Sequence, residues 1–255
     1  MRRRSARTAP GERPGVHIGT CGWHYAHWRG RFYPADLPAS RWLAWYAQRL
    51  RTVEIDSTFY RLPDPAVFAG WREAAPAGFR FAVKAPRSIT HRRKLRGCDA
   101  TVRDFLERIG LLAPALGPVL FQLPPRWHRN TGRLAAFLDA LPPDARYAFE
   151  FRDPTWHHPE VYTLLTRARA AFCIYDLAGF HSPKIATTDF VYLRLHGPRR
   201  AYGGSYTASA LRAIADELRA WQRDGKEVYV FFDNDEAGYA ARNAALLADL
   251  LEPMR

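Results

Sequence analysis

Eight short runs rich in β-branched and aromatic residues recur along this chain, and segments with helical character separate them. The runs cover residues 16–20, 53–56, 79–84, 118–123, 147–151, 171–176, 190–196 and 228–232. Such an alternation is typical of βαβ units, which place parallel strands in one sheet. A chain of 255 residues has the usual length of eight such units. We therefore expect an α/β fold, a single (β/α)8 TIM-barrel domain over residues 15–255.

The segments between the runs support the same fold. Helical periodicity is clearest over 207–223, which carries one apolar face. That face consists of Leu211, Ile214, Leu218 and Trp221. Further helices are expected near 40–50, 65–75, 101–113, 131–140, 159–169 and 238–251. After the sixth run, Gly179 and Pro183 break a connection that is too short for a full helix, so one outer helix is expected to be degenerate. A doubly wound open sheet is the alternative, but its glycine-rich dinucleotide turn is absent from the sequence.

The composition indicates a cytoplasmic protein that does not enter a membrane. No stretch approaches the ~18 consecutive apolar residues of a membrane span, and the N-terminal segment lacks the apolar part of a secretory signal. The three cysteines, Cys21, Cys98 and Cys173, are far apart and odd in number. They predict reduced thiols instead of a disulfide framework.

The positive charge is a second general feature of the sequence. Its 38 basic and 25 acidic residues give a formal +13, which indicates phosphate-bearing or nucleic-acid partners. However, residues 1–14, an expected disordered basic tail, hold five arginines against one glutamate. Only four basic residues are lysine, which indicates a coding bias toward arginine. The positions of the charges are therefore more informative than their sum.

Polar side chains gather where the expected strands end. Barrel strands alternate between interior and helix layer, and functional side chains collect at the C-terminal ends of the strands. The polar residues at these ends are Glu54, Lys84, Gln122, Glu150, Arg152, Asp176, Arg194 and His196. Burying them without partners would cost several kcal/mol each, so we expect them to converge on one wet pocket at the mouth of the barrel.

Four of these residues are candidate catalytic groups. Lys84 can orient an anion, exchange protons with a lowered pKa, or form a Schiff base. Glu54 and Glu150 are candidate general bases, and His196 is a candidate acid or base near neutral pH. The alternative is a structural network that closes the mouth, in which Glu54 pairs with Lys84 and Glu150 pairs with Arg194.

Aromatic and basic residues crowd the loops that follow the strands. Flat aromatic faces beside guanidinium groups suit stacking on sugars or bases and contact with phosphates. The candidate substrate-binding residues are Trp23, Tyr60, Arg87, Gln122, Arg152, Trp156, Asp176, Arg194 and Asn234. The alternative for many of the aromatic residues is that they pack the loops together.

The strand-end residues include candidate ligands for one cofactor, a divalent metal ion. Its ligands would come from Glu54, Glu150, Asp176, His196 and Asp233. The nearby cations Lys84, Arg152 and Arg194 would oppose such an ion, so a metal is not favoured and no cofactor is assigned.

Several motifs occur in an order that resembles a known family. They are IGTCGWHYAHWRGRFYP (18–34), VEIDSTFYRLP (53–63), FRFAVKAPRSITH (79–91), GPVLFQLPP (117–125), FEFRDPTW (149–156), VYLRLHG (191–197), VYVFFDND (228–235) and ARNA (241–244). In this order they are similar to the YecE-like family, also called domain of unknown function 72. The likeness extends from about residue 16 to 250. It implies a TIM barrel, and it leaves the activity open because that of the family is not established.

The resemblance also implies which strand-end positions are characteristic of the family. They fall on Glu54, Lys84, Gln122, Glu150, Arg152, Arg194, His196 and Asn234. The chain departs from the family pattern at Cys21, where serine is usual, and at Asp153, where histidine is common. It also carries Asp56 and Asp233, where asparagine is usual, which implies a more acidic mouth.

Two hypotheses of function follow. The first is an enzyme that uses strand-end acid and base groups on a sugar phosphate, nucleotide or other phosphoester, as a hydrolase or an isomerase. The second is a non-catalytic barrel that binds nucleic acid through its basic loops and arginine-rich tail. The expected partner is a small anionic or sugar-containing ligand, and the sequence identifies no protein partner.

Overall fold

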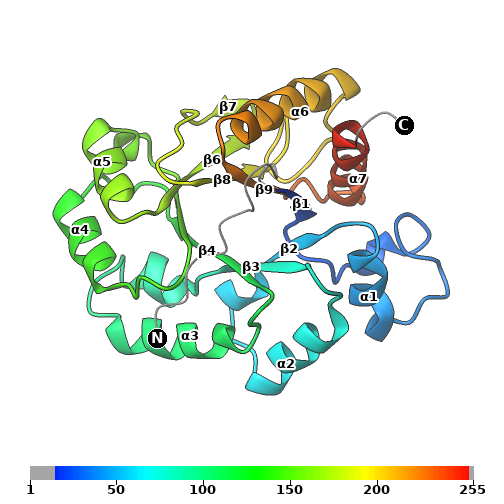
Figure 1. Cartoon of the computed structure of the whole chain (residues 1–255), viewed down its shortest axis with the longest axis horizontal. Helices are drawn as coiled ribbons and strands as arrows, with labels where there is room; N and C mark the ends of the chain where they lie inside the picture. The colour runs from blue at the N-terminus through cyan, green and yellow to red at the C-terminus, as the bar shows by residue number, and fades with distance from the viewer. Residues whose placement is uncertain (1–14, 253–255) are drawn as a thin grey trace.

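A ring of parallel strands occupies the centre of the molecule, and helices surround it (Figure 1). The computed structural model describes residues 15–252. The eight strands of the ring are β1 (Val16–Thr20), β2 (Thr52–Ile55), β3 (Arg80–Lys84), β4 (Leu116–Leu123), β5 (Tyr147–Phe151), β6 (Ala171–Leu177), β8 (Phe190–Leu195) and β9 (Glu227–Phe232). Hydrogen bonds join them in the order β1-β9-β8-β6-β5-β4-β3-β2. The predicted single-domain barrel is confirmed.

The barrel closes between β1 and β2 without a regular ladder. A single parallel bridge joins Cys21 to Glu54 at this seam. Below it, the hydroxyl of Tyr46 accepts a hydrogen bond from the backbone N–H of Thr20 and donates one to the carbonyl of Thr52, both at 2.9 Å. A buried phenol thus replaces backbone pairing, which satisfies polar groups that would otherwise lie unpaired in the core.

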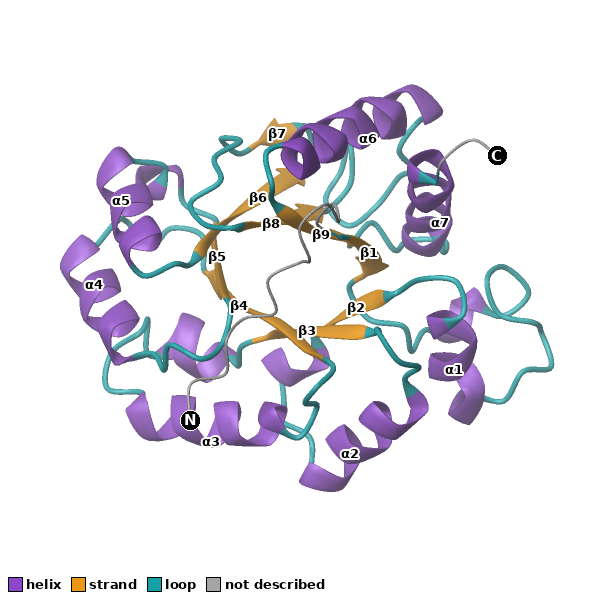
Figure 2. Cartoon of the chain, in the orientation of Figure 1, coloured by secondary structure: helices purple, strands orange, loops and turns teal. Residues whose placement is uncertain are grey.

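The helices form the outer layer (Figure 2). They are α1 (Trp42–Ala47), α2 (Pro65–Ala74), α3 (Asp99–Gly110), α4 (Thr131–Ala140), α5 (Pro159–Arg167), α6 (Ala208–Arg223) and α7 (Tyr239–Leu251). Shorter helical turns are η1 (Ala26–Trp28), η2 (Ala39–Arg41), η3 (Ser57–Phe59), η4 (Ser88–Arg92) and η5 (Pro154–Trp156). The local sequence determines where several helices begin. Pro65 and Pro159 occupy the first turns of α2 and α5, and the side chains of Asn130 and Thr207 cap the N-termini of α4 and α6. No helix among the described residues is long and apolar enough to cross a membrane.

The expected degenerate helix lies between β6 and β8. Within the described chain, this connection has no helix and instead contains β7 (Phe180–His181), which pairs antiparallel with β6. Gly179 makes the turn at a φ of +85°, a conformation that favours glycine. A cavity of about 310 Å³ remains between these strands and α6, lined in part by Ile174, Leu193 and Ile214.

Alternate strand residues fill the barrel interior. A buried apolar layer crosses its middle, formed by Cys21, Ala82, Leu120, Ala148, Ala171, Cys173, Phe190, Tyr192, Tyr229 and Phe231. At the N-terminal end, Glu227 accepts hydrogen bonds from His17 at 2.8 Å and from the Tyr229 hydroxyl at 2.9 Å, and it pairs with Arg146. This end is thus closed by its own polar contacts, whereas Glu54, Glu150 and Arg194 lie at the opposite mouth, where the strands end.

Candidate functional site

Arg194 on β8 is the centre of the mouth. Its side chain is 1% exposed, and it donates to the carboxylate of Glu54 at 2.7 Å and to that of Glu150 at 2.8 Å. The Tyr192 hydroxyl donates to the other oxygen of Glu54 at 2.6 Å. The planar guanidinium can reach two carboxylates at once, which a lysine ammonium does less well. Of the two predicted ion pairs, Glu150 with Arg194 is confirmed, whereas Glu54 pairs with Arg194 instead of Lys84.

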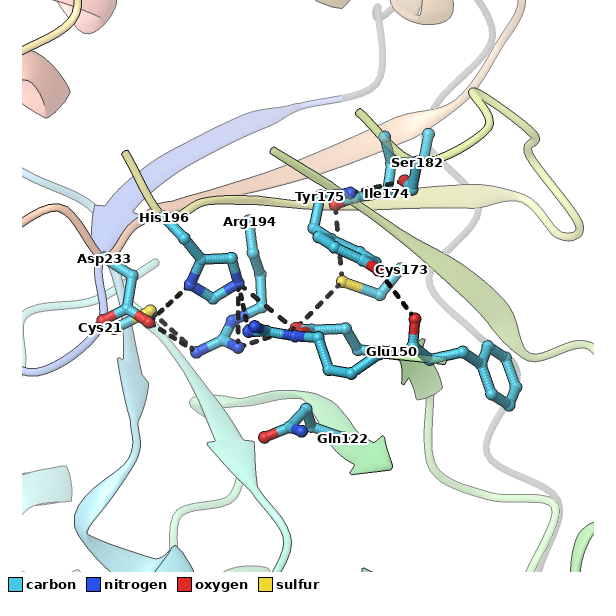
Figure 3. A network of polar contacts seen from close by, with 12 residues as sticks. Cys21, Gln122, Glu150, Cys173, Ile174, Tyr175, Ser182, Arg194, His196 and Asp233 are labelled. Carbon is cyan, nitrogen blue, oxygen red and sulfur yellow. Dashed lines mark hydrogen bonds and ion pairs between the residues drawn. The ribbon is translucent and has the colours of Figure 1, made fainter. Parts of the chain in front are cut away.

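Two buried thiols border this ion network (Figure 3). Cys21 Sγ lies 3.3 Å from a guanidinium nitrogen of Arg194, and Cys173 Sγ lies 3.8 Å from a carboxylate oxygen of Glu150. Burial raises the pKa of both thiols well above the ordinary range, although Arg194 lowers it. Both cysteines are therefore protonated at neutral pH and are poor nucleophiles.

His196 lies beside the network in a fixed tautomer. Its Nδ1 is 2.8 Å from Asp233 Oδ2, and its Nε2 is 2.8 Å from a guanidinium nitrogen of Arg152. Arginine can only donate, so Nε2 accepts and the proton resides on Nδ1, where it is donated to Asp233. Burial opposes ionisation of Asp233, but the His196 hydrogen bond and the charge of Arg194 hold its pKa below the ordinary value. These two contacts orient the imidazole, with Nε2 toward Arg152.

Glu150 is a permanent anion at the base of the mouth. Burial favours its neutral form, yet the charges of Arg152 and Arg194 hold its pKa well below the ordinary value. A carboxylate with so low a pKa is a weak proton acceptor. The environment of Glu150 therefore suits positioning of the two arginines better than the predicted role of general base.

Lys84 and Asp56 differ from the residues below them because, within residues 15–252, neither side chain has a hydrogen-bonding or ionic partner. The Lys84 ammonium lies 4.3 Å from the ring centre of Phe59, and it forms no hydrogen bond or ion pair with any described residue. Burial and the charge of Arg194 lower its pKa. Burial and the neighbouring carboxylates of Asp233 and Glu54 raise the pKa of Asp56 to about 6. Both residues are largely but not fully buried, so a ligand at the mouth can reach them.

The β3 side of the mouth is cationic. Burial, together with the charges of Lys84, Arg152 and Arg87, lowers the pKa of His91 to about 4. Three cations therefore act on one neutral imidazole at the surface. Arg87 also lies over the ring of Tyr60, at 5.8 Å from the ring centre. This side of the mouth would attract a negatively charged group.

The comparisons with known proteins agree with this barrel and its motifs. The family model described as "Protein of unknown function DUF72" matches residues 17–255. The chain belongs to the DUF72 family. It is similar to a DUF72 family protein from Thermotoga maritima MSB8 of known crystal structure, with a TM-score of 0.86 and 29% identity over 94% of this chain and 100% of that one.

Two curated relatives of this DUF72 chain carry related names. UPF0759 protein YecE of Escherichia coli (strain K12) is 37% identical over 140 residues, which make up 54% of this chain and 49% of that protein. UPF0759 protein YunF of Bacillus subtilis (strain 168) is 26% identical over 93% of this chain and 95% of its own length. This match therefore spans about half of the Escherichia coli relative. None of these names states a reaction.

Three of the predicted binding residues do not face the mouth of the DUF72 barrel. Trp156 is fully buried and stacked on Phe151, so no ligand reaches it. Asp176 falls at an outward position of β6, where it accepts from the Tyr206 hydroxyl at 3.0 Å. Asn234 is also fully buried and holds the loop after β8 by donating to Gly204. Asp176 shares the outward parity of Phe172 and Ile174 on β6, and Asn234 lies beyond the end of β9, where the alternation of a strand no longer applies.

The other predicted binding residues lie at the mouth or beside it. Gln122 is 7% exposed at the end of β4 and donates to the carbonyl of Leu123 at 2.9 Å. Trp23 and Tyr60 line a groove next to the mouth. The prediction omitted Asp56 from the candidate set. Its inward position two residues after Glu54 was the signal that could have identified it.

The mouth has no ready set of metal ligands. Among residues 15–252, no three His, Cys, Asp or Glu side chains are arranged to hold a metal ion. Glu54 and Glu150 are both occupied by Arg194, and His196 Nε2 by Arg152. The atoms that could bind a metal ion therefore already accept hydrogen bonds from the arginines.

We expect Asp56→Asn to stabilise the fold at alkaline but not at acidic pH. The pKa of Asp56 rises from 3.8 to about 6 on folding, so stability falls as the pH increases through this range. Above this pKa, the ionised carboxylate therefore destabilises the fold. The uncharged asparagine should raise the free energy of unfolding by about 2 kcal/mol near pH ~8 and by little near pH ~4. Urea unfolding at both pH values measures the difference. An equal gain at the two values would contradict the assigned ionisation.

Proposed function

We propose that this DUF72 protein is an enzyme that acts on a small anionic substrate at the mouth of its barrel. The observation that carries the proposal is the Lys84 ammonium, which is largely buried and has no ionic partner in the described part of the chain. Withdrawing an ammonium from water without a hydrogen-bonding partner is unfavourable. An anionic group from a ligand would supply that partner.

The surrounding charges support an anion at this position. The carboxylates nearest the barrel axis are already paired, since Glu54 and Glu150 contact Arg194. The charges of Lys84, Arg152 and Arg87 all act on His91, whose pKa they lower together with burial. A phosphate or carboxylate there would meet cations that the fold has already placed at the mouth, which is the arrangement that favours catalysis of charged substrates.

Proton-transfer groups lie next to the proposed anion site. Asp56, with a pKa of about 6, can donate or accept a proton near neutral pH. His196 is a second candidate. Its Nε2 contacts Arg152 at 2.8 Å and Arg194 at 3.5 Å, and an anion that attracts Arg152 would remove the nearer of these two donors. These groups suit phosphoester hydrolysis, with a base that activates water, and isomerisation, with a base that removes a carbon-bound proton. Asp233 then orients His196 in either reaction.

The test is a panel of sugar phosphates, nucleotides and simple phosphoesters, assayed for turnover and for binding by calorimetry. We expect binding of at least one class, competition by inorganic phosphate, and a loss of turnover on His196→Asn while the thermal midpoint is retained. If no member of the panel binds at millimolar concentration, the anionic substrate is wrong. Affinity for DNA or RNA that falls steeply with salt and is unaffected by changes at the mouth would favour the nucleic-acid alternative instead.

A further inference from the structure

A groove lies beside the mouth, between the loop after β1 and helices α1 and α2. Its volume is about 740 Å³, which is within the range of pockets that hold small molecules. Trp23, Tyr25, Tyr60 and Trp71 supply aromatic walls, and Asp56 lies where the groove meets the strand ends. The groove is thus continuous with the proposed anion site through a group that titrates.

The lining of the groove suits a flat ring. Trp23 and Trp71 meet edge to face, with ring centres 5.2 Å apart, so that they form a rigid corner. Tyr60 is 71% exposed, so much of its ring is open to a ligand. Most of the lining is apolar or aromatic, and its other polar side chains are His24, Ser40, Asp56 and Ser57. Broad aromatic walls suit a heteroaromatic ring, which stacks on them and needs only one or two polar partners, better than a sugar, whose many hydroxyls each need a partner.

Tyr60 also connects the groove to Lys84. Its ring lies 5.1 Å from that of Phe59, and the Lys84 ammonium lies 4.3 Å from the Phe59 ring centre. Arg87 covers the Tyr60 ring from the cationic side of the mouth. If a ligand stacked its ring on Tyr60, a group attached to that ring would therefore extend toward Lys84.

We propose that this groove is the ring-binding part of the substrate site and that it takes a nitrogen heterocycle, such as a purine or pyrimidine base, joined to an anionic group. The assignment rests on the proposed function for its anionic half and selects nucleotides from the wider set of anionic substrates. The Asp56 carboxyl would hydrogen-bond a ring N–H or ring nitrogen, depending on its protonation.

Gly70 offers a test that fills the groove without removing any side chain. It lies in α2 and lines the groove, and a Cβ added to it would meet no atom within 4 Å. Leucine also favours a helix more than glycine does, so Gly70→Leu is expected to fold. The matched control is Gly110→Leu, at an equally open helical position of α3 outside the groove.

The probes are the four ribonucleoside monophosphates, their nucleosides, and ribose 5-phosphate. For at least one base, we expect the nucleoside and its monophosphate to bind the wild type and to quench the fluorescence of Trp23 and Trp71. Gly70→Leu should weaken both by about tenfold or more. It should leave ribose 5-phosphate within about twofold, since that probe lacks a ring. Gly110→Leu should change none of them.

The possible failures are distinct. If ribose 5-phosphate binds through Lys84 while no nucleoside binds, or nucleoside binding is unaffected by Gly70→Leu, the ring site is overturned and the anionic site remains. If nucleosides bind and respond to Gly70→Leu while no phosphate compound depends on Lys84, the groove is supported and the anionic site is overturned.

Discussion

Replacing Arg194 with methionine is expected to lower the free energy of unfolding by about 3–5 kcal/mol, because it leaves buried carboxylates without their shared partner. Glu54 and Glu150 are both fully buried, and each accepts a short hydrogen bond from this guanidinium. Of the described residues, the Tyr192 hydroxyl would remain as the hydrogen-bond donor to Glu54, and Arg152 would remain as the arginine paired with Glu150. Urea unfolding, followed by circular dichroism, measures the loss.

A combined variant separates the loss of charge pairing from the loss of packing. Arg194→Met together with Glu54→Gln and Glu150→Gln removes the buried charges as well as their partner, and it should recover a large part of the stability. Recovery is the expected result because neutral replacements of a buried ion network are often tolerated. A single Arg194→Met variant that loses less than about 1 kcal/mol would show that the ion network is not what holds the mouth together.

Strand parity made much of the site predictable from the sequence. The inward direction of Glu54, Lys84, Glu150 and Arg194 follows from the period of two along a strand, and the parallel sheet then brings the strand ends to one mouth. Broken helical character after β6 also correctly indicated the missing helix. These features depend on local sequence and on the order of elements, which the sequence contains directly.

The partners of each residue were not predictable in the same way. Which carboxylate meets Arg194 depends on side-chain lengths and on the stagger of non-adjacent strands, and Lys84 was assigned a partner that the structure gives to Arg194. Asp176 lies on the outward face of β6, and Asn234 follows the end of β9, so strand parity does not direct either side chain to the mouth. The importance of Asp56 depends on its burial beside Asp233, which only the folded chain brings about.

The second large effect is expected for Lys84→Met, which should weaken ligand binding but, unlike Arg194→Met, should not lower the stability of the fold. Both cations lie at the same mouth, but Arg194 has partners in the protein whereas Lys84 forms no ion pair with described residues. Methionine has a similar length and no charge to desolvate. We expect the unfolding free energy to remain within about 1 kcal/mol of the wild type or to increase. Binding of the anionic substrate should weaken about 100-fold, because the bound anion would lose its buried counter-charge.

The pH dependence gives a second, independent measure of the same group. Since the pKa of Lys84 is lowered, anion binding by the wild type should weaken at a pH below the ordinary range of lysine, as the ammonium loses its proton. Lys84→Met should bind weakly at every pH and lose this step. Lys184→Met is the matched control, because Lys184 is exposed and pairs with Glu217 of the outer helix α6. A Lys84→Met protein that is destabilised but still binds anions with the wild-type pH profile would show that Lys84 serves the fold and not a ligand.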